Sequence, residues 1–358
     1  MTVPYWQFVL VQPASAGGAS VAELTEARSR RLDFALDDDA KCGWTLPGRH
    51  PQTALVDEME TDVLVARDGI ALFRGRINAS DDSISPNVHT CTFSAVDYRG
   101  MLARRIIWPG STTAFAATDQ ANIAARLISD SQALGTLGIS TTVTPTGILR
   151  DRTYDVGSTI GDLIASLGRA INGFEWDISP TLALRIFYPA RGSSSVAFVA
   201  EYGRNVSDVR RTVASGDFAN SIRFSGKEGV ASVTRTITPG PEGRWERQAG
   251  NPDLTTAAAI GEQADGALAR SSTITPNYSV TLMPGTWSPG KVWLGDVIRL
   301  LVRSGRLDVD TTTRVVGVSF DIGEDGEEQV TLQLGRYRWQ FPDRIADYQD
   351  RLDRLERS

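Results

Sequence analysis

The residue pattern closest to a known catalytic motif lies between Gly285 and Lys291. GTWSPGK has the GxxxxGK spacing of a phosphate-binding loop, in which backbone N–H groups surround the phosphates and the lysine contacts them. Three features argue against phosphate binding. Val292 stands where a Ser or Thr would hold Mg²⁺, Pro289 removes a backbone N–H group, and a strand rather than a helix is predicted to follow. We therefore interpret this segment as the entry to a strand.

Carboxylates and histidines elsewhere in the chain form no recognisable catalytic or metal-binding pattern. The run from Asp37 to Asp39 is interpreted as a solvated loop, because consecutive side chains diverge and no calcium-loop spacing follows. His50 and His89 lie outside any HExxH pattern and have no nucleophile motif beside them. A glycosidase needs two facing carboxylates, and the sequence singles out no such pair. We therefore predict no catalytic residue, no cofactor and no metal ligand, and expect that the chain is not an enzyme.

The cysteines and tryptophans are also interpreted structurally. Cys42 and Cys91 fit no zinc or redox spacing, and two buried, unpaired thiols are favoured over a disulfide between them. The eight tryptophans are dispersed along the chain, mostly at the ends of predicted strands. That distribution favours anchors of a core or an interface over a platform for carbohydrate.

Composition sets broad limits on function. The 358 residues have ordinary hydrophobic and charged fractions, and a net charge of −6 argues against nucleic-acid binding by the whole surface. Arginine greatly outnumbers lysine, since only three of the 37 basic residues are lysines. A GC-rich genome and a use of arginine for bidentate contacts between subunits both explain this excess. We expect no secretion signal and no membrane-spanning helix, because no apolar window approaches 18 residues.

Period-two alternation dominates both ends of the chain and predicts a mainly β fold of the α+β class. Residues 61–66 and 70–77 form a predicted hairpin across Arg67-Asp68-Gly69. Near the other end, strands are predicted at 292–302, 314–322 and 329–334, and Gly326 supplies the turn between the last two. A weak internal similarity between residues 62–77 and 296–318 is explained by two related β units, and equally well by chance.

Helical spacing appears in the middle and at the end of the chain. A helix capped by Thr118 or Asp119 is followed by one with a capping-box pattern at Thr159. After Pro342, four apolar residues follow heptad spacing, which predicts a short helix that associates with copies of itself or docks on a neighbour: Ile345, Tyr348, Leu352 and Leu355. A frayed polar tail is the alternative.

These patterns divide the chain into four predicted parts. Residues 1–110 form an N-terminal β-barrel domain, and residues 111–205 form an α/β insert. Residues 206–340 form a second β-barrel, with a helical insertion near 253–270 that Asp253 caps. Residues 341–358 form the C-terminal heptad helix. Besides that helix, we expect subunit contacts at the strands that carry Trp293, Val316 and Val318.

Three segments taken together resemble the tail hub (baseplate hub, or minor tail) proteins of tailed bacteriophages, of the siphophage type. The first is TDVLVARDGIALFRGRI at 61–77, followed by FSAVDYRGML at 93–102. The second is GSTIGDLIASLGRAINGFEWDI at 157–178. The third is WLGDVIRLLV at 293–302, which leads through RVVGV to VTLQLG at 330–335. The resemblance covers most of the chain in the order β unit, α/β insert, β unit.

The resemblance implies a structural protein of the virion, assembled in the host cytoplasm and located at the tail tip. It implies a homotrimer whose six barrels join the hexameric tail tube to a threefold tip around the channel for DNA. Implied partners are a distal tail or tail-tube protein, the tape measure protein and other minor tail proteins, while DNA passes without specific binding. A cell-wall-active hydrolase and a spike-type hub of a contractile injection or secretion system are the alternatives.

Overall fold

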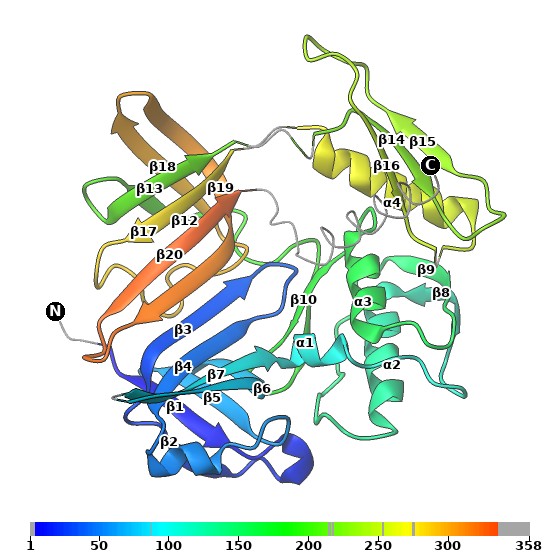
Figure 1. The fold of residues 1–358 in the computed structure, drawn as a ribbon. Coiled ribbons are helices and arrows are strands. Elements are labelled where there is room, and N and C mark those ends of the chain that lie inside the picture. The colour runs from blue at the N-terminus through cyan, green and yellow to red at the C-terminus, as the bar shows by residue number, and fades with distance from the viewer. Residues whose placement is uncertain are drawn as a thin grey trace.

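Strands are the main regular structure in the computed structural model, which describes residues 4–86, 88–213, 216, 218–252, 254–273 and 276–335 (Figure 1). The mainly β, α+β class predicted from the sequence is confirmed. The predicted domain boundaries stay a prediction, and the units named below are defined by the strands and cores of the structure. The predicted C-terminal helix, 341–358, lies outside the described residues.

The first β unit contains seven strands and two short 3-10 helices, Ala14–Ala16 and Pro51–Leu55. Its strands are β1 (Trp6–Val11), β2 (Ser20–Glu23), β3 (Arg28–Ala35), β4 (Lys41–Pro47), β5 (Asp62–Arg67), β6 (Ile70–Ser85) and β7 (Val88–Asp97). The predicted turn between β5 and β6 is confirmed. Asp68 (φ 51°) and Gly69 (φ 78°) both adopt the left-handed conformation that a two-residue hairpin turn requires.

The β6–β7 hairpin is longer than the sequence predicts, since the predicted strand ends at Ile77, before the polar segment from Asp81 to Ser85. In the structure β6 continues to Ser85, where it pairs with Val88 at the start of β7. Pairing with β7 satisfies the backbone groups of this polar segment, so tertiary context overrides its low strand propensity.

The middle unit, residues 98–189, follows β7 directly and contains three helices and two small two-stranded sheets, β8 with β9 and β10 with β11. Its elements are α1 (Tyr98–Leu102), β8 (Ala114–Asp119), α2 (Gln120–Gln132), β9 (Leu149–Thr153), α3 (Ile160–Arg169), β10 (Glu175–Ile178) and β11 (Leu184–Phe187). Asp119 caps α2 as predicted, since its side chain accepts a hydrogen bond from the Ala121 amide. Thr159 precedes α3 as predicted, but its side chain makes no capping hydrogen bond.

The second β unit contains six strands that come from two separated parts of the sequence. They are β12 (Val196–Glu201), β13 (Val206–Thr212), β17 (Asn277–Leu282), β18 (Val297–Ser304), β19 (Leu307–Ile322) and β20 (Glu328–Gly335). Val330, Leu332 and Leu334 face the core on β20, as their alternation predicts. β18 starts five residues later than predicted, because Asp296 forms a turn by accepting a hydrogen bond from the Trp293 amide.

A fourth unit, here called the lobe, comprises residues 218–272 and lies between β13 and β17 in the sequence. A three-stranded sheet of β14 (Ser221–Ser225), β15 (Val233–Thr236) and β16 (Glu246–Gly250) packs against helix α4 (Ala257–Ser271). The predicted helical insertion is therefore part of a small unit with its own core. Thr256 caps α4, and its side chain accepts from the Ala259 amide; the predicted cap, Asp253, lies outside the described residues.

Strand β19 joins the two β units into one 13-stranded sheet among the described residues. Its first half pairs with β18, and its second half pairs with β20 on one side and β3 on the other. A bulge between Val315 and Gly317 marks the exchange of partners, and there the Val316 carbonyl accepts a hydrogen bond from Leu36 of the first unit. One strand thus belongs to both β units.

A cluster of aromatic rings lies beneath this shared strand. Phe320 of β19 is fully buried, with its ring 5.4 Å from that of Trp6, 6.1 Å from that of Phe34 and 4.7 Å from that of Trp287. Trp6 and Phe34 belong to the first β unit, whereas Trp287 and Phe320 belong to the second half of the sequence. One continuous hydrophobic core therefore spans both β units.

We expect replacement of Phe320 by alanine to destabilise the protein by about 3–5 kcal/mol, because it removes a ring that both β units contact. The free energy of unfolding in urea, followed by circular dichroism, measures the loss. Trp108→Ala is the control, because Trp108 is 51% exposed and its loss leaves no cavity in the core. Equal effects of the two substitutions would contradict this account of the joint.

Candidate functional site: contacts between the units of the chain

The described residues predicted to form subunit contacts are part of the chain's own core. Val318 is fully buried and Val316 is 4% exposed. Trp293 is half-buried and packs against the same core. The prediction that the strands carrying these residues contact another subunit stays a prediction. The remaining predicted contact residues lie outside the described residues and stay a prediction: Ile345, Tyr348, Leu352 and Leu355.

The candidate chemical residues make local contacts with nearby backbone groups or rings. His50 accepts a hydrogen bond from the Gln52 amide at the start of a 3-10 helix, and His89 lies in β7. Lys291 of the GxxxxGK segment bonds the Thr286 carbonyl and lies 5.4 Å from the centre of the Phe198 ring. Within the described part of the chain, no group of three or more His, Cys, Asp or Glu side chains is placed to hold a metal ion.

Two predictions about polar side chains have opposite outcomes. Cys42 and Cys91 are unpaired and buried, as predicted. The interpretation of residues 37–39 as a solvated loop is wrong, since all three aspartates are half-buried and Asp39 lies 3.9 Å from Arg99. Burial raises the pKa of Asp37, while the charge of Arg99 opposes that rise.

A buried ion pair connects the two β units beside the aromatic cluster. Arg67 of β5 holds Glu328 of β20 through Nη2–Oε1 (2.6 Å) and Nε–Oε2 (2.8 Å) contacts. The indole of Trp6 also donates to Glu328, at 3.1 Å, and the Arg67 guanidinium lies 5.0 Å from the Trp287 ring centre. Both charged side chains are less than a tenth exposed. The geometry is bidentate, which fixes the relative position of the two strands.

We expect Arg67→Met and Glu328→Gln to cost about 3–5 kcal/mol each, since each leaves a buried partner unsatisfied. The double variant is expected to lose less than the sum, because no unpaired charge remains. Urea unfolding of the four proteins gives the coupling free energy. Arg299→Met is the matched control, because the bidentate pair of Arg299 with Asp310 is solvent-exposed. Strict additivity at Arg67 and Glu328 would contradict the assignment.

A second set of contacts connects the middle unit to the first β unit. Asp62 of β5 is fully buried and accepts hydrogen bonds from Arg76 Nε and from the Tyr98 hydroxyl, each at 2.6 Å. Burial, followed by the charge of Asp62, raises the pKa of Tyr98 to about 12. Tyr98 begins α1, so this carboxylate determines how the middle unit leaves the sheet.

The middle unit also contacts the second β unit through a bidentate pair. Arg314 of β19 reaches Glu175 of β10 with N–O distances of 2.5 and 2.6 Å, and it also donates to the Gly295 and Arg191 carbonyls. Arg191 in turn holds Asp177, 2.5 Å away. A cavity of about 340 Å³ lies beside this network and is lined by residues of three units, among them Trp287, Trp293 and Arg99.

Asp97, which also lines that cavity, caps α1 by accepting from the Gly100 amide at 3.0 Å. Burial, followed by the neighbouring charge of Asp39, raises the pKa of Asp97 from 3.8 to about 8. Between these values the folded protein holds a proton at Asp97 that the unfolded chain releases. Stability contributed by this group therefore falls as the pH rises from about 4 to about 8.

We expect Asp97→Asn to flatten that part of the stability–pH profile, since the amide cannot ionise but still accepts the capping hydrogen bond. Urea midpoints of wild type and variant, measured from pH 4 to pH 8, test this. Asp308→Asn, at an exposed aspartate, is expected to leave the slope unchanged. If the wild-type and Asp97→Asn profiles run parallel, Asp97 is ionised in the folded protein and the assignment fails.

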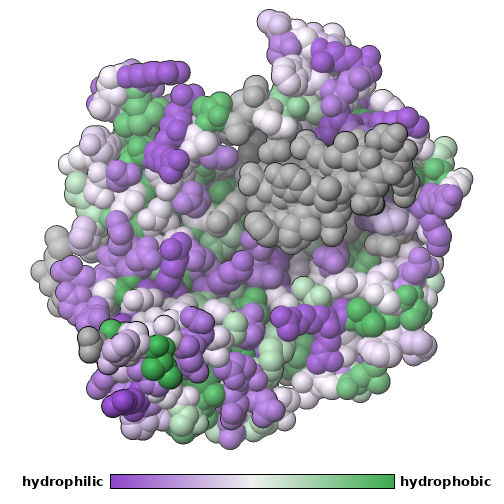
Figure 2. Space-filling view, viewed as in Figure 1, coloured by the Kyte–Doolittle hydropathy of each residue, from purple (hydrophilic) through white to green (hydrophobic). Residues whose placement is uncertain are grey.

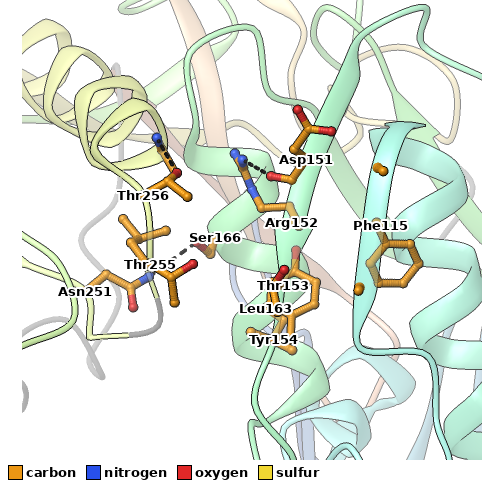
Figure 3. Close-up of a pocket in the computed structure, with 14 residues that line it drawn as sticks. Phe115, Asp151, Arg152, Thr153, Tyr154, Leu163, Ser166, Asn251, Thr255 and Thr256 are labelled. Carbon is orange, nitrogen blue, oxygen red and sulfur yellow. Dashed lines mark hydrogen bonds between the residues drawn. The ribbon is translucent and has the colours of Figure 1, made fainter. Parts of the chain in front are cut away.

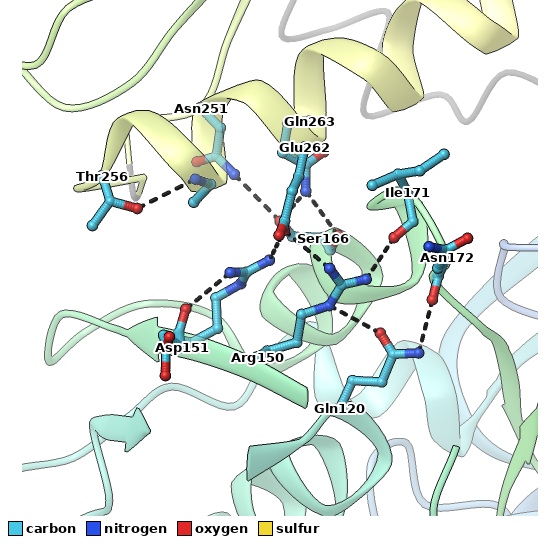
Figure 4. Close-up of polar contacts among 12 residues, drawn as sticks. Gln120, Arg150, Asp151, Ser166, Ile171, Asn172, Asn251, Thr256, Glu262 and Gln263 are labelled. Atoms are coloured by element: carbon cyan, nitrogen blue, oxygen red, sulfur yellow. Dashed lines mark hydrogen bonds and ion pairs between the residues drawn. The ribbon is translucent and has the colours of Figure 1, made fainter. Parts of the chain in front are cut away.

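The lobe and the middle unit meet through polar side chains (Figure 4). Glu262 of α4 lies 3.1 Å from Arg150 and 2.9 Å from Arg152, which both belong to β9. Gln263 donates to the Ser166 carbonyl at 3.0 Å, and Arg270 donates to the Arg169 carbonyl at 2.8 Å. A cavity of about 370 Å³ separates the two units beside these contacts (Figure 3).

Sequence patterns missed all these pairs because each joins residues distant in sequence, such as Arg67 with Glu328. The available signal was the excess of arginine, since arginine supplies the charged donor in all the contacts between units described above apart from those of Trp6, Gln263 and Tyr98. Exposed hydrophobic residues offer no comparable signal. On the face drawn in Figure 2, hydrophilic residues separate the hydrophobic ones.

No family model and no curated protein matches the sequence. Solved structures do match. The tail protein from Neisseria meningitidis MC58 aligns over 92% of this chain and 96% of its own, with a TM-score of 0.65 and 15% identity. The 43 kDa tail protein of prophage MuSo2 from Shewanella oneidensis aligns over 92% and 97%, with a TM-score of 0.64 and 16% identity.

The chain has the fold of phage tail proteins. This confirms the resemblance noted in the sequence at the level of fold. An Escherichia coli component of the type VI secretion system, described as similar to the T4 bacteriophage tail proteins gp27 and gp5, shares this fold more distantly. It aligns over 87% of this chain and 74% of its own, with a TM-score of 0.50 and 8% identity. Among the helices that the structure describes, none is long and apolar enough to cross a bilayer.

Proposed function

We propose that the protein is a structural component of a phage tail, located at the tail tip of the virion. The observation that carries the proposal is the agreement in fold with two tail proteins over more than nine-tenths of each chain. The contacts between units support it as well. Bidentate ion pairs, one of them buried, and a shared strand make a rigid scaffold, and rigidity suits a protein that transmits position rather than turning over a substrate.

In this proposal three copies form a hub ring. Each chain carries two β units on one continuous sheet, so a trimer presents six such units to a hexameric tail tube. The partners are a distal tail or tail-tube protein, the tape measure protein and other minor tail proteins. DNA passes through the ring without specific binding, and the net charge of −6 supports weak attachment to phosphates.

We expect light scattering of the purified protein to give about three times the 38.8 kDa mass of the chain, alone or after addition of its tail-tip partners. Electron microscopy of tails labelled at the C-terminus is expected to place the label at the tip. A stable monomer under both conditions would rule out the ring. A label along the tail shaft would rule out the location.

A hub of a contractile injection or secretion system is the second candidate, because the type VI component shares the fold. Neighbouring genes separate the two. A sheath protein and an ATPase encoded nearby favour the contractile system, whereas a long tape-measure gene upstream favours a siphophage tail.

A further inference from the structure

The lobe and the middle unit have separate hydrophobic cores. Ile222, Phe224 and Leu254 belong to the core of the lobe, together with the inner face of α4. The core of the middle unit is built around α2 and α3. Between the two, the cavity of Figure 3 takes the place of apolar packing, and its wall includes Phe115, Leu163 and Leu254. The polar contacts of Figure 4 thus carry much of the attachment.

The two arginines that the middle unit contributes to these contacts, Arg150 and Arg152, also make hydrogen bonds within the middle unit. Arg150 donates to Gln120 Oε1 at 3.2 Å and to the Ile171 carbonyl at 2.5 Å. Arg152 donates to the carbonyl of Asp151 at 2.9 Å. Both guanidinium groups therefore keep hydrogen bonds within the middle unit when Glu262 leaves, which lowers the cost of separation.

The lobe's part of these contacts lies on one face of α4. Glu262, Gly266 and Arg270 follow each other at four-residue spacing and contact the middle unit. Ile260, Ala264 and Leu268, on the opposite face, are buried in the lobe's own core. One face of α4 is therefore part of the lobe's core. Its outer face makes polar contacts with β9 and with the end of α3.

Close approach of the two units depends on Gly266. A Cβ atom at this position would meet the Arg169 carbonyl oxygen at 2.8 Å, which is closer than a methyl group tolerates. Glu262 is one-third exposed while Arg150 and Arg152 are less than a tenth exposed, so salt and water reach these ion pairs from the carboxylate side. The interface is consequently tightly packed at Gly266 and held by solvent-accessible ion pairs at Glu262.

We propose that the lobe, residues 218–272, separates from the middle unit as a rigid body, and that Glu262 is the latch that holds it closed on Arg150 and Arg152. Opening exposes the cavity wall and leaves both hydrophobic cores intact. The inference goes beyond the tail role and does not rest on it.

Two spin labels, at the exposed positions Ser129 of α2 and Thr234 of β15, report the distance between middle unit and lobe. A second pair, at Thr234 and Glu246 of β16, reports the shape of the lobe itself. Gly266→Ala raises helix propensity in α4 but inserts a methyl group against Arg169, so it is expected to open the interface without unfolding the lobe.

In Gly266→Ala, and in Glu262→Gln, we expect the population with the longer lobe-to-middle distance to rise about tenfold, which corresponds to 1.4 kcal/mol. High salt is expected to act in the same direction on wild type. The distance within the lobe is expected to stay constant throughout.

Matched controls lie on the same helix. Gly261→Ala adds its methyl group near the Arg235 side chain inside the lobe, and Asp265→Asn removes an exposed ion pair with that same arginine. Neither control is expected to change the lobe-to-middle distance. The proposal is overturned if Gly266→Ala and Glu262→Gln behave like these controls. It is equally overturned if the distance within the lobe broadens, because the lobe then unfolds instead of moving.

Discussion

The pairing of β19 with β3 is the constraint on which the rest of the structure depends. A bulge at Val316 allows one strand to leave β18 and continue along the first β unit, so two sheets become one. Phe320 then lies where rings from both halves of the sequence meet. Because the strand and the core are shared, neither β unit can shift without breaking backbone hydrogen bonds and packing together.

Arginine–carboxylate pairs hold the other units to this framework, and they differ in burial. Arg67 with Glu328 is enclosed and bidentate, which suits a permanent joint. The side chains of Arg314 and Glu175 are 24% and 17% exposed, and that of Glu262 is 33% exposed although Arg150 and Arg152 are less than a tenth exposed. Solvent exposure weakens an ion pair, so both of these attachments are expected to be weaker than the enclosed pair of Arg67 and Glu328.

This difference agrees with the proposed role in a tail tip. A rigid sheet that spans two β units can continue a tube, whereas units attached by polar contacts can change position during assembly or ejection. The fold shared with known tail proteins at 15–16% identity indicates that backbone pairing and core shape, rather than particular surface residues, define this scaffold.

The sequence by itself determined local features such as the alternating strands and the Asp68-Gly69 turn. It narrowed the cap of α2 to Thr118 or Asp119 and favoured two unpaired thiols. Such features depend on neighbouring residues, whose spacing decides which side chains share a face. It failed where distant partners decide, as in the paired segment at 81–85 and the burial of Asp37 to Asp39. Only the tertiary structure showed that Val318 belongs to the core and that Glu262 meets Arg150, because pairs so far apart in sequence leave no periodic signal.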